Sequence, residues 1–531
     1  MSHMPETITA PACTTFDDWL AVSTDGFAAM NAGRDPAHLV KELVQNALDA
    51  LGLGGGEIQL NCQAQDGGVR ITCRDSGCGM ANLADIRTVF HTSKTDSHLQ
   101  RGRMGRGFKE MLCMALEATV TSGRRRIEFR MEHGRRVTRQ VQLPADQATP
   151  GTLVEMQMPW DGDVIQHLVK YFQGMLVPDG VHLVVNGQRV CHRLAQDRIE
   201  ASLPTELLED GRWIRPIRKT AIELVPVREG EVPMVYELGI PVCPIEWTVG
   251  FHANVQQRVP MNPCRDAVAS GYLLKLHRAC LPTLLPELSE EQVRQDWVGS
   301  AAPHCDEAVQ QQIIAKGFGQ NIARSVPKMG ARQFDEDARE IGTMIIDTRQ
   351  TSGGFRQILQ QHVPTTMEVV EEHNRKRVQA AAAGSFDVAD VYQAQDDASA
   401  RRRRLIESVG GKERVEQVMD FARWFCQKLL DGYEGSAVCS VTLAMLKDVG
   451  AIATWSSDDV LTLGIDTPWL WTDPFGEESL ATLIHEAAHH LNAHHGQDFH
   501  KELEKLAGRA ARIMLLHGQE VRQRWPGLSG R

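Results

Sequence analysis

Two widely separated stretches of the chain hold residues whose types and spacing are suited to chemistry. The first is the run LIHEAAHHLNAHHGQDFH (Leu483–His500), which holds six histidines in eighteen residues. Its HEAAH segment places His485 and His489 four residues apart, on one face of a helix, with Glu486 beside them. Imidazole nitrogens are common zinc ligands, and a neighbouring carboxylate can activate water. The run therefore predicts a hydrolytic zinc site, with ordinary surface histidines on a helix as the alternative interpretation.

The residues after HEAAH indicate the kind of zinc site. His495 follows His489 by six positions, and Phe499 comes four positions later. This spacing resembles SprT-like and related short zincins, which read HExxH, five residues, a histidine and then an aromatic residue. The resemblance implies that Glu486 activates the water and that the zinc ligands are His485, His489 and His495. His494 and His500 are rival third ligands, whereas His490 points off the ligand face.

The second stretch begins with KELVQNALDA, in which Glu42, Asn46 and Asp49 recur at helical spacing and so share one helical face. A solvated face of an amphipathic helix is the alternative. Three further patterns follow: an acidic residue with two glycines after a predicted strand, glycines before a predicted helix, and a Gly-Thr pair that opens a strand. They are Asp75, Gly77 and Gly79; Gly102, Gly105 and Gly107; and Gly151 and Thr152. Glycines before a helix let backbone N–H groups approach phosphates.

In this order and spacing, the four patterns resemble the GHKL ATPase superfamily of heat-shock chaperones, type II topoisomerases, MutL and MORC proteins. The resemblance covers about residues 25–160 and implies a Bergerat fold, with ATP between the helices and a mixed sheet. It implies that Glu42 is the general base, that Asn46 holds Mg²⁺ and that Asp75 accepts the adenine amino group. The other expected nucleotide contacts are Asp49 on the same helical face, Gly77 and Gly79 beside the base, Gly102, Gly105 and Gly107 at the phosphates, Thr152 in the adenine pocket, and Ser93 and Lys94 of the HTSK segment at the lid.

A short segment further along the chain resembles a second element of the heat-shock chaperones. VPMNPCRD matches their LPLNxSRE segment, whose arginine reaches the γ-phosphate, and Arg265 stands in the place of that arginine. An ordinary surface ion pair is the alternative for Arg265. If the match holds, residues 161–290 form a transducer domain that senses the nucleotide.

Hydrophobic periodicity divides the rest of the chain. Helical and period-two patterns are mixed up to about residue 290. The sequence is then helical and polar to about residue 405, and a last compact unit follows. We predict an α+β multidomain protein with four parts. They are an N-terminal Bergerat α/β sandwich (1–160), an α/β transducer-like domain (161–290), a helical connector (291–405) and a C-terminal zincin-like α+β domain (406–531).

Composition bounds the function further. Hydrophobic residues make up 42% of the 531 residues and charged residues 24%, as in ordinary soluble proteins. The 57 basic and 68 acidic residues give a formal charge of -11, which argues against a general nucleic-acid coat. No apolar run approaches the roughly 20 residues of a membrane helix, and no secretory signal is visible. The twelve scattered cysteines then indicate reduced thiols and a cytoplasmic location.

The fusion of the two stretches predicts an ATP-gated zinc metalloprotease. A GHKL module that forms a homodimer on ATP would control a C-terminal peptidase that cuts a protein substrate, with ATP, Mg²⁺ and Zn²⁺ as cofactors. Such a fusion would suit bacterial stress or antiphage defence. The alternative is a nucleotide-operated clamp or chaperone-like switch on nucleic acid or protein, with a metal-binding C-terminal module that does not turn over. Two basic runs support it, Gly123–Arg136 and Arg401–Arg404.

Overall fold

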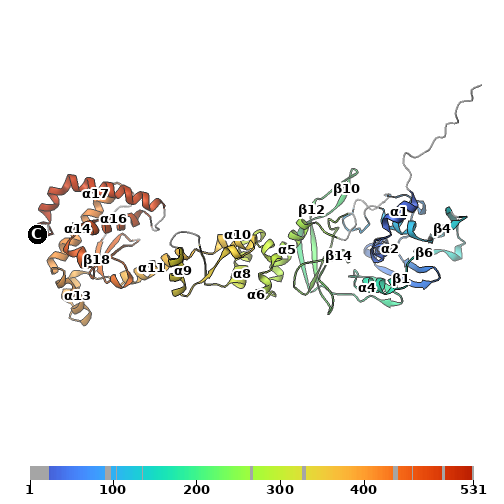
Figure 1. The fold of residues 1–531 in the computed structure, drawn as a ribbon, viewed down its shortest axis with the longest axis horizontal. Coiled ribbons are helices and arrows are strands. Elements are labelled where there is room, and N and C mark those ends of the chain that lie inside the picture. Colours follow the sequence, from blue (N-terminus) through green and yellow to red (C-terminus); the bar gives the residue numbers. More distant parts are fainter. Residues whose placement is uncertain are drawn as a thin grey trace, which may run out of the picture. The chain divides into compact units, whose positions relative to one another are not determined.

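The fold is known from a computed structural model that describes residues 23–89, 97–102, 105–133, 135–262, 267–325, 331–433, 440–456, 458–492 and 497–528. The chain forms two compact units. The first comprises residues up to 320 together with 349–361, and the second comprises 321–348 and the residues from 362 onward. Both units combine helices with sheets (Figure 1), so the predicted α+β multidomain class is confirmed.

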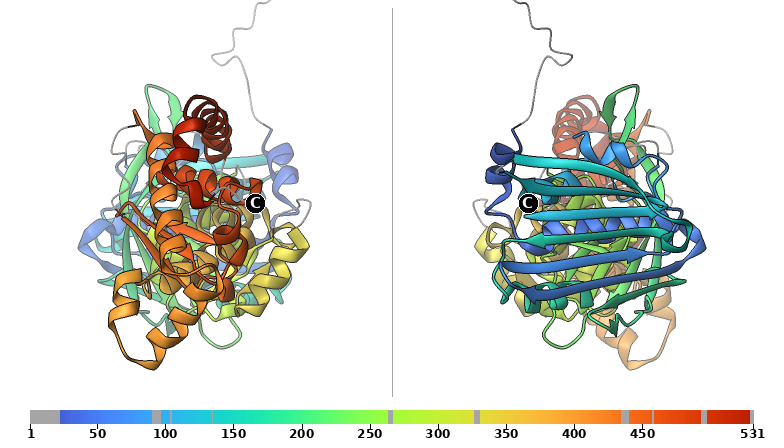
Figure 2. Two further views of the ribbon diagram at one scale, coloured as in Figure 1. Left: turned by 90° about the vertical axis from the view of Figure 1, so that its left-hand side faces the viewer. Right: turned by 90° about the vertical axis from the view of Figure 1, so that its right-hand side faces the viewer.

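The first unit contains an eight-stranded sheet with the order β5-β4-β3-β6-β2-β1-β7-β8. Figure 2 shows these strands side by side in its right-hand view. The strands are β1 (Gly56–Gln65), β2 (Gly68–Asp75), β3 (Glu117–Gly123), β4 (Arg125–Glu132), β5 (Arg135–Gln142), β6 (Thr149–Met158), β7 (Val181–Val185) and β8 (Gln188–Arg189). The helices of this part are α1 (Thr24–Asn31), α2 (Pro36–Leu51), α3 (Gly107–Met114) and α4 (Val164–Gln173).

One face of this sheet packs against α2 because strand and helix both bury apolar residues at their own periods. Ile58 and Leu60 alternate with polar residues along β1 and are fully buried. Leu39 and Leu43 lie on one side of α2, at most 3% exposed, and belong to the same core. Burial of this kind contributes about 25 cal/mol per Å² of apolar surface. The core therefore holds α2 in a fixed register against the central strands.

The sheet continues past residue 160, where the sequence placed a domain boundary. After α4 the chain returns as β7, which pairs parallel to β1 with Ile58 opposite Leu183. Leu183 and Val185 are buried in the same core as α2. The strand pattern of residues 181–185 carries no sign of which earlier strand it will join, because pairing is a long-range choice.

A second, five-stranded sheet follows in the same unit, with the order β14-β13-β15-β12-β9. Its strands are β9 (Asp197–Pro204), β12 (Ile217–Pro226), β13 (Met234–Glu237), β14 (Ile240–Pro244) and β15 (Phe251–Val255). A separate hairpin of β10 (Leu207–Glu209) and β11 (Arg212–Ile214) lies between β9 and β12 in the chain.

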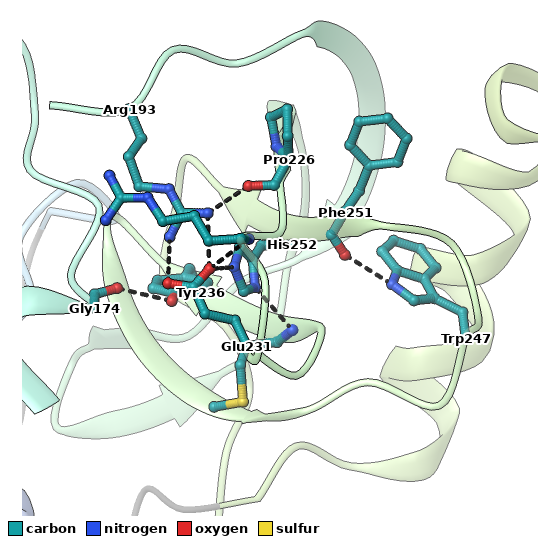
Figure 3. A network of polar contacts seen from close by, with 10 residues as sticks. Gly174, Arg193, Pro226, Glu231, Tyr236, Trp247, Phe251 and His252 are labelled. Carbon is teal, nitrogen blue, oxygen red and sulfur yellow. Dashed lines mark hydrogen bonds and ion pairs between the residues drawn. The ribbon is translucent and has the colours of Figure 1, made fainter. Parts of the chain in front are cut away.

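A polar network ties the two sheets of this unit together (Figure 3). The Tyr236 hydroxyl of β13 donates to the Gly174 carbonyl at the end of α4, at 2.9 Å. Arg193, which follows β8, pairs with Glu231 at 3.0 Å, and Glu231 accepts from His252 Nε2 at 3.2 Å. The Met234 N–H donates to His252 Nδ1. Burial is the largest effect on this imidazole and lowers the pKa of His252, so its ring is a neutral bridge within the second sheet.

Helices continue the first unit after the second sheet. They are α5 (Ser270–Leu284), α6 (Glu290–Val293), α7 (Asp296–Ala301), α8 (Glu307–Phe318) and α10 (Gly353–His362). Within this layer, His277 of α5 lies between Trp247 and Trp297, with ring centroids 6.0 and 5.4 Å away. His277 is 8% exposed, and its Nε2 has no hydrogen-bond partner among the described residues.

His277 is expected to make this layer sensitive to acid. Burial lowers the pKa of His277 to about 4, below its ordinary value of 6.5. The unfolded chain therefore binds the proton more readily, and stability falls as the pH drops from about 6.5 toward 4, by roughly 2 kcal/mol between pH 7 and pH 5. Hydrogen exchange of α5 at the two pH values measures this loss. We expect His277→Phe to abolish the difference and His304→Gln, a change on the exposed surface, to retain it.

The second unit holds the C-terminal histidine run. Its strands are β16 (Ile322–Arg324), β17 (Met344–Ile346), β18 (Ser440–Ala444), β19 (Ala453–Trp455) and β20 (Val460–Gly464), of which the last three form a sheet ordered β18-β20-β19. Its helices are α9 (Ala331–Glu340), α11 (Thr366–Ala382), α12 (Val388–Gln393), α13 (Asp397–Ser408), α14 (Lys412–Leu430), α15 (Pro468–Thr472), α16 (Glu477–Leu491) and α17 (Gln497–Arg524).

The core of this second unit reaches back into the segment that the sequence assigned to a connector. Val388 and Val391 of α12 and Ile406 of α13 are at most 3% exposed and pack in one cluster with α14 and α16. The segment contains many charged residues and few apolar ones, so its sequence resembles that of a solvent-exposed connector. Of the helices in the described residues, none is both long and apolar enough to cross a membrane.

Candidate functional site

The helix α2 presents the first group of predicted site residues to a cavity of about 1040 Å³. Asp35 caps its N-terminus by accepting from the Ala37 N–H at 2.8 Å, and Pro36 starts the first turn. Because the opposite side of α2 is buried in the core, Glu42, Asn46 and Asp49 all face the cavity, and Glu42 and Asn46 are half-buried. The predicted shared face is therefore present.

Asp75 lies at the end of β2, directly opposite Thr152 of β6 in the ladder. Both residues line the cavity and are at most 8% exposed. The Asp75 Oδ1 accepts the Gly77 N–H at 2.9 Å, which fixes the carboxylate in one orientation. The arrangement puts an oriented acceptor next to a hydroxyl at one end of the cavity, as recognition of an exocyclic amine requires.

The glycines beside Asp75 are needed for close packing. A side chain on Gly77 would meet the Ala50 carbonyl of α2 at 2.7 Å. Gly79 has a φ of 71° and lines the cavity, and Gly151 has a φ of 72° where a Cβ would lie 2.0 Å from the Asp75 carbonyl. Gly77 therefore allows the loop to pack on α2, whereas Gly79 allows it to pack against Ser122, whose Oγ would lie 2.6 Å from a Cβ there.

The second glycine group forms the other end of the cavity. Gly102, Gly105 and Gly107 all line it, and α3 begins at Gly107. A Cβ on Gly107 would lie 2.4 Å from the carboxyl carbon of Glu42. The start of α3 thus lies next to the predicted general base, and a helix N-terminus at a cavity is suited to an anionic ligand.

Asp49 has a different contact from the one expected of a nucleotide ligand. Its carboxylate accepts the backbone N–H groups of Arg101 and Gly102, each at 2.9 Å, and its side chain is 1% exposed. Asp49 therefore anchors the loop that carries the second glycine group to α2.

Two arginines that the sequence analysis did not single out, Arg258 and Arg101 of the loop itself, also hold this loop in place. Arg258 is fully buried; its Nε donates to the Gln100 carbonyl at 2.6 Å and its Nη2 to the Gly102 carbonyl at 2.5 Å. Arg101 donates to the Leu238 carbonyl of the second sheet, at 2.6 and 3.1 Å. Burial lowers the pKa of Arg101, and the carboxylates of Asp49 and Glu237 oppose that shift. Arg258 is 156 positions from Gly102, so no local pattern in the sequence indicates that it bonds this loop.

Comparison with known proteins agrees with this geometry. The family described as "Histidine kinase-, DNA gyrase B-, and HSP90-like ATPase" matches residues 31–159. This segment is a GHKL-type ATPase domain. The crystal structure of the N-terminal domain of a DNA repair protein aligns with 46% of this chain and 92% of its own, at 12% identity and a TM-score of 0.28. No curated protein matches the chain.

The ATPase assignment makes ATP with Mg²⁺ the ligand that suits the cavity of residues 31–159. Asn46 lines this cavity together with Glu42, so an amide oxygen is available there for a Mg²⁺ ion. Ser93, Lys94 and Arg265, which were expected at the lid and at the γ-phosphate, lie outside the described residues.

The histidine run is placed on α16. His485 and His489 face each other with their Nε2 atoms 3.1 Å apart, and Phe499 of α17 packs within 5.2 Å of both rings, measured between centroids. Two nitrogens that each bind one tetrahedral zinc ion at about 2.0–2.1 Å lie about 3.3 Å apart. The two nitrogens are within hydrogen-bond distance of each other, and this spacing is also close to that of two ligands of one ion.

Glu486 is buried beside this pair. Its carboxylate accepts the backbone N–H of Trp455 from β19, and burial raises the pKa of Glu486 to about 7 against the effect of that bond. His485, Glu486 and His489 line a cavity of about 1820 Å³ whose other walls are β19 and one side of α11. A carboxyl group whose pKa is close to neutral pH, beside two imidazoles in a large cavity, is suited to proton transfer.

The remaining histidines of the run have different surroundings. His490 Nδ1 bonds Asp459 at 2.7 Å, away from the pair, as expected from its position on the helix. His500 is exposed on α17. His495 and His494 lie outside the described residues, and within the described part of the chain no third His, Cys, Asp or Glu joins the pair in a ligand group.

Proposed function

We propose that this protein is an ATP-regulated zinc metalloprotease, in which the GHKL ATPase domain controls hydrolysis of a protein substrate by the unit that contains α16. The observation that carries the proposal is the pair of imidazole Nε2 atoms 3.1 Å apart, with Glu486 next in the chain and a large cavity in front of them. Glu486 is 7% exposed beside the two facing histidines, and a glutamate is rarely so buried on an ordinary surface helix.

Each residue of this second site would have a defined role. His485 and His489 would hold Zn²⁺, with His495 as the third ligand and His494 or His500 as its rivals. When bound, the metal would supply Lewis-acid chemistry to a peptide carbonyl. Glu486 would accept a proton from the attacking water, a role that a pKa near neutrality favours. β19 is the edge strand of its sheet beside the cavity, a position that would suit an extended peptide.

The ATPase domain would act as the control element. Glu42 would orient the attacking water, Asn46 would hold Mg²⁺ and Asp75 would bind the adenine amino group. We further propose that ATP brings two copies together as a homodimer, since Bergerat-fold ATPases close in this way by the resemblance described above. Any communication between the two sites would require a change between discrete states of the chain.

A second candidate function is a nucleotide-operated clamp on nucleic acid. It is favoured by Arg135 and Arg139 of β5, which lie on an edge strand and are exposed. The run Arg401–Arg404 supports it less, because Arg403 donates to the carbonyls of Val391 and Ala394 and so has a structural role. Binding to DNA that weakens steeply with salt, without protein cleavage, would favour this candidate.

Replacing members of the histidine site tests the peptidase. His485→Ala is expected to lose about one zinc per chain, whereas Glu486→Gln should keep the metal and lower cleavage at least a hundredfold, on the order of a general-base contribution. His500→Ala should retain zinc if His495 is the third ligand. Elemental analysis measures the metal, and mapping of new protein termini in a cell lysate incubated with Zn²⁺ and ATP measures cleavage.

Two outcomes would remove the proposal or part of it. Equal cleavage by wild type and Glu486→Gln would exclude α16 as the catalytic helix. If cleavage depends on Glu486 but is the same with and without ATP, and the same in Glu42→Ala, then the two sites are independent enzymes on one chain. His517→Ala, on the exposed side of α17, serves as the control for nonspecific effects of removing a histidine.

A further inference from the structure

The hairpin of β10 and β11 is a short arm whose shape follows from its turn. Asp210 and Gly211 both have left-handed backbones, with φ values of 50° and 75°, as a two-residue hairpin turn requires. Leu207 is 2% exposed and anchors the first strand. Trp213 of the second strand is 41% exposed, so its ring is accessible to a ligand.

One face of the arm is turned to the ATPase cavity. Trp213 and Arg215 are two positions apart and therefore share a face, with Glu206 directly across the hairpin from Arg215. Glu206, Trp213 and Arg215 all line the cavity that Glu42 and Asp75 line. Arg212 points to the other face by the same alternation.

The base of the arm is connected to the loop that carries Gly102. The Thr205 hydroxyl donates to the Arg258 carbonyl at 3.0 Å, and both residues are fully buried. The Arg258 side chain in turn donates to the carbonyl of Gly102. The arm is therefore connected to the glycine loop through a single residue, and its Arg215 lines the same cavity as that loop.

Arg215 has the chemistry of a phosphate ligand. Its guanidinium pairs with one Glu206 oxygen, at 2.9 Å from Nη2 and 3.1 Å from Nε, and its side chain is 61% exposed. A guanidinium has five donors and binds phosphate in a bidentate way, so one carboxylate does not exhaust it. Glu206 keeps the group oriented, and the carboxylate would repel phosphates if the arginine were absent.

We propose that the β10–β11 hairpin is a nucleotide-contacting arm of the ATPase site, in which Arg215 pairs with the phosphates of ATP and Trp213 touches the bound nucleotide. This hairpin, which belongs to neither of the two larger sheets, then supplies part of the ATP site within a single chain. This inference rests on the ATPase domain alone and is independent of the peptidase.

The test uses the full chain and an ATP that carries a fluorescent N-methylanthraniloyl group on its ribose. Energy transfer from tryptophan to the bound analogue should fall in Trp213→Phe. Arg215→Gln should weaken binding of the analogue about tenfold, as loss of a charge-assisted bond to phosphate does. Adding Glu206→Gln to Arg215→Gln should recover part of that loss, because the repelling carboxylate is removed. Arg212→Gln, on the other face of the same hairpin, should bind like wild type.

The recovery in the double variant distinguishes contact from mere support of the fold. If Arg215→Gln and Trp213→Phe both bind the analogue like wild type, with undiminished energy transfer, the arm does not touch the nucleotide. If Arg215→Gln weakens binding, the double variant is no better and hydrogen exchange of the hairpin rises in both, the role is structural and the proposal is overturned.

Discussion

Glu42→Ala is expected to lower the rate of ATP hydrolysis by about 10²- to 10⁴-fold, the usual contribution of a general base. The Glu42 carboxylate lines the cavity from α2. It packs so closely against Gly107 that a Cβ there would lie 2.4 Å from the carboxyl carbon. A base positions the attacking water and contributes little to ground-state affinity, so ATP binding should be retained. Phosphate release under saturating ATP measures the rate, and equilibrium binding of the fluorescent analogue measures the affinity.

Two further variants serve as comparisons for Glu42→Ala. Asn46→Ala, one turn along the same face, should weaken binding of Mg·ATP itself. Glu117→Ala removes an exposed carboxylate at the start of β3 and should leave both quantities unchanged. Hydrolysis by Glu42→Ala at the wild-type rate would show that another group orients the water.

Arg258→Met is expected to release the glycine loop and to reduce ATP turnover strongly while the rest of the first unit stays folded. The buried guanidinium bonds two loop carbonyls, Gln100 O and Gly102 O, and its removal leaves both without that donor. Charge-assisted bonds of this kind contribute about 1.5–3 kcal/mol each. Asp49 still bonds the loop to α2, so we expect the loop to become more mobile without detaching. The lost Arg258 bonds should therefore appear as faster hydrogen exchange in residues 97–102.

A neighbouring arginine provides the matched control. Arg218 is exposed, and its Nη1 lies 3.5 Å from His98 Nδ1 in the same segment. Arg218→Met should therefore change neither loop exchange nor turnover by much. Arg258→Lys should restore a part of both, since an ammonium can reach one carbonyl but lacks the fork that reaches two. Unchanged exchange in Arg258→Met would mean that the backbone bonds alone hold the loop.

The residues of the ATPase site were predictable because their relations are local. Glu42, Asn46 and Asp49 share a face by helical spacing alone, and the structure places all three at one cavity. Gly151 and Gly79 stand where a positive φ is required, and such positions select glycine in the sequence itself. The ATPase segment was recognisable for the same reason, since its motifs are short runs.

The function of Asp49 was not predictable in the same way. Its position on the helix suggested a nucleotide contact, whereas its carboxylate holds the N–H groups of Arg101 and Gly102. The choice between a ligand and a loop depends on where residues 101–102 return in space. Spacing along α2 carries no information about that return.

The sequence by itself determined the local chemistry of this protein: a GHKL-type ATPase segment, a helix with two histidines one turn apart, and glutamates beside both. Only the tertiary structure decided what supports that chemistry. Arg258 is 156 positions from Gly102, β7 joins β1 across more than one hundred residues, and Arg215 reaches a cavity built by the preceding domain. Helical and strand periods specify which side of an element is buried, because they depend on neighbouring residues. Which distant element covers that side depends on the packing of the whole core, and no short run of sequence contains it.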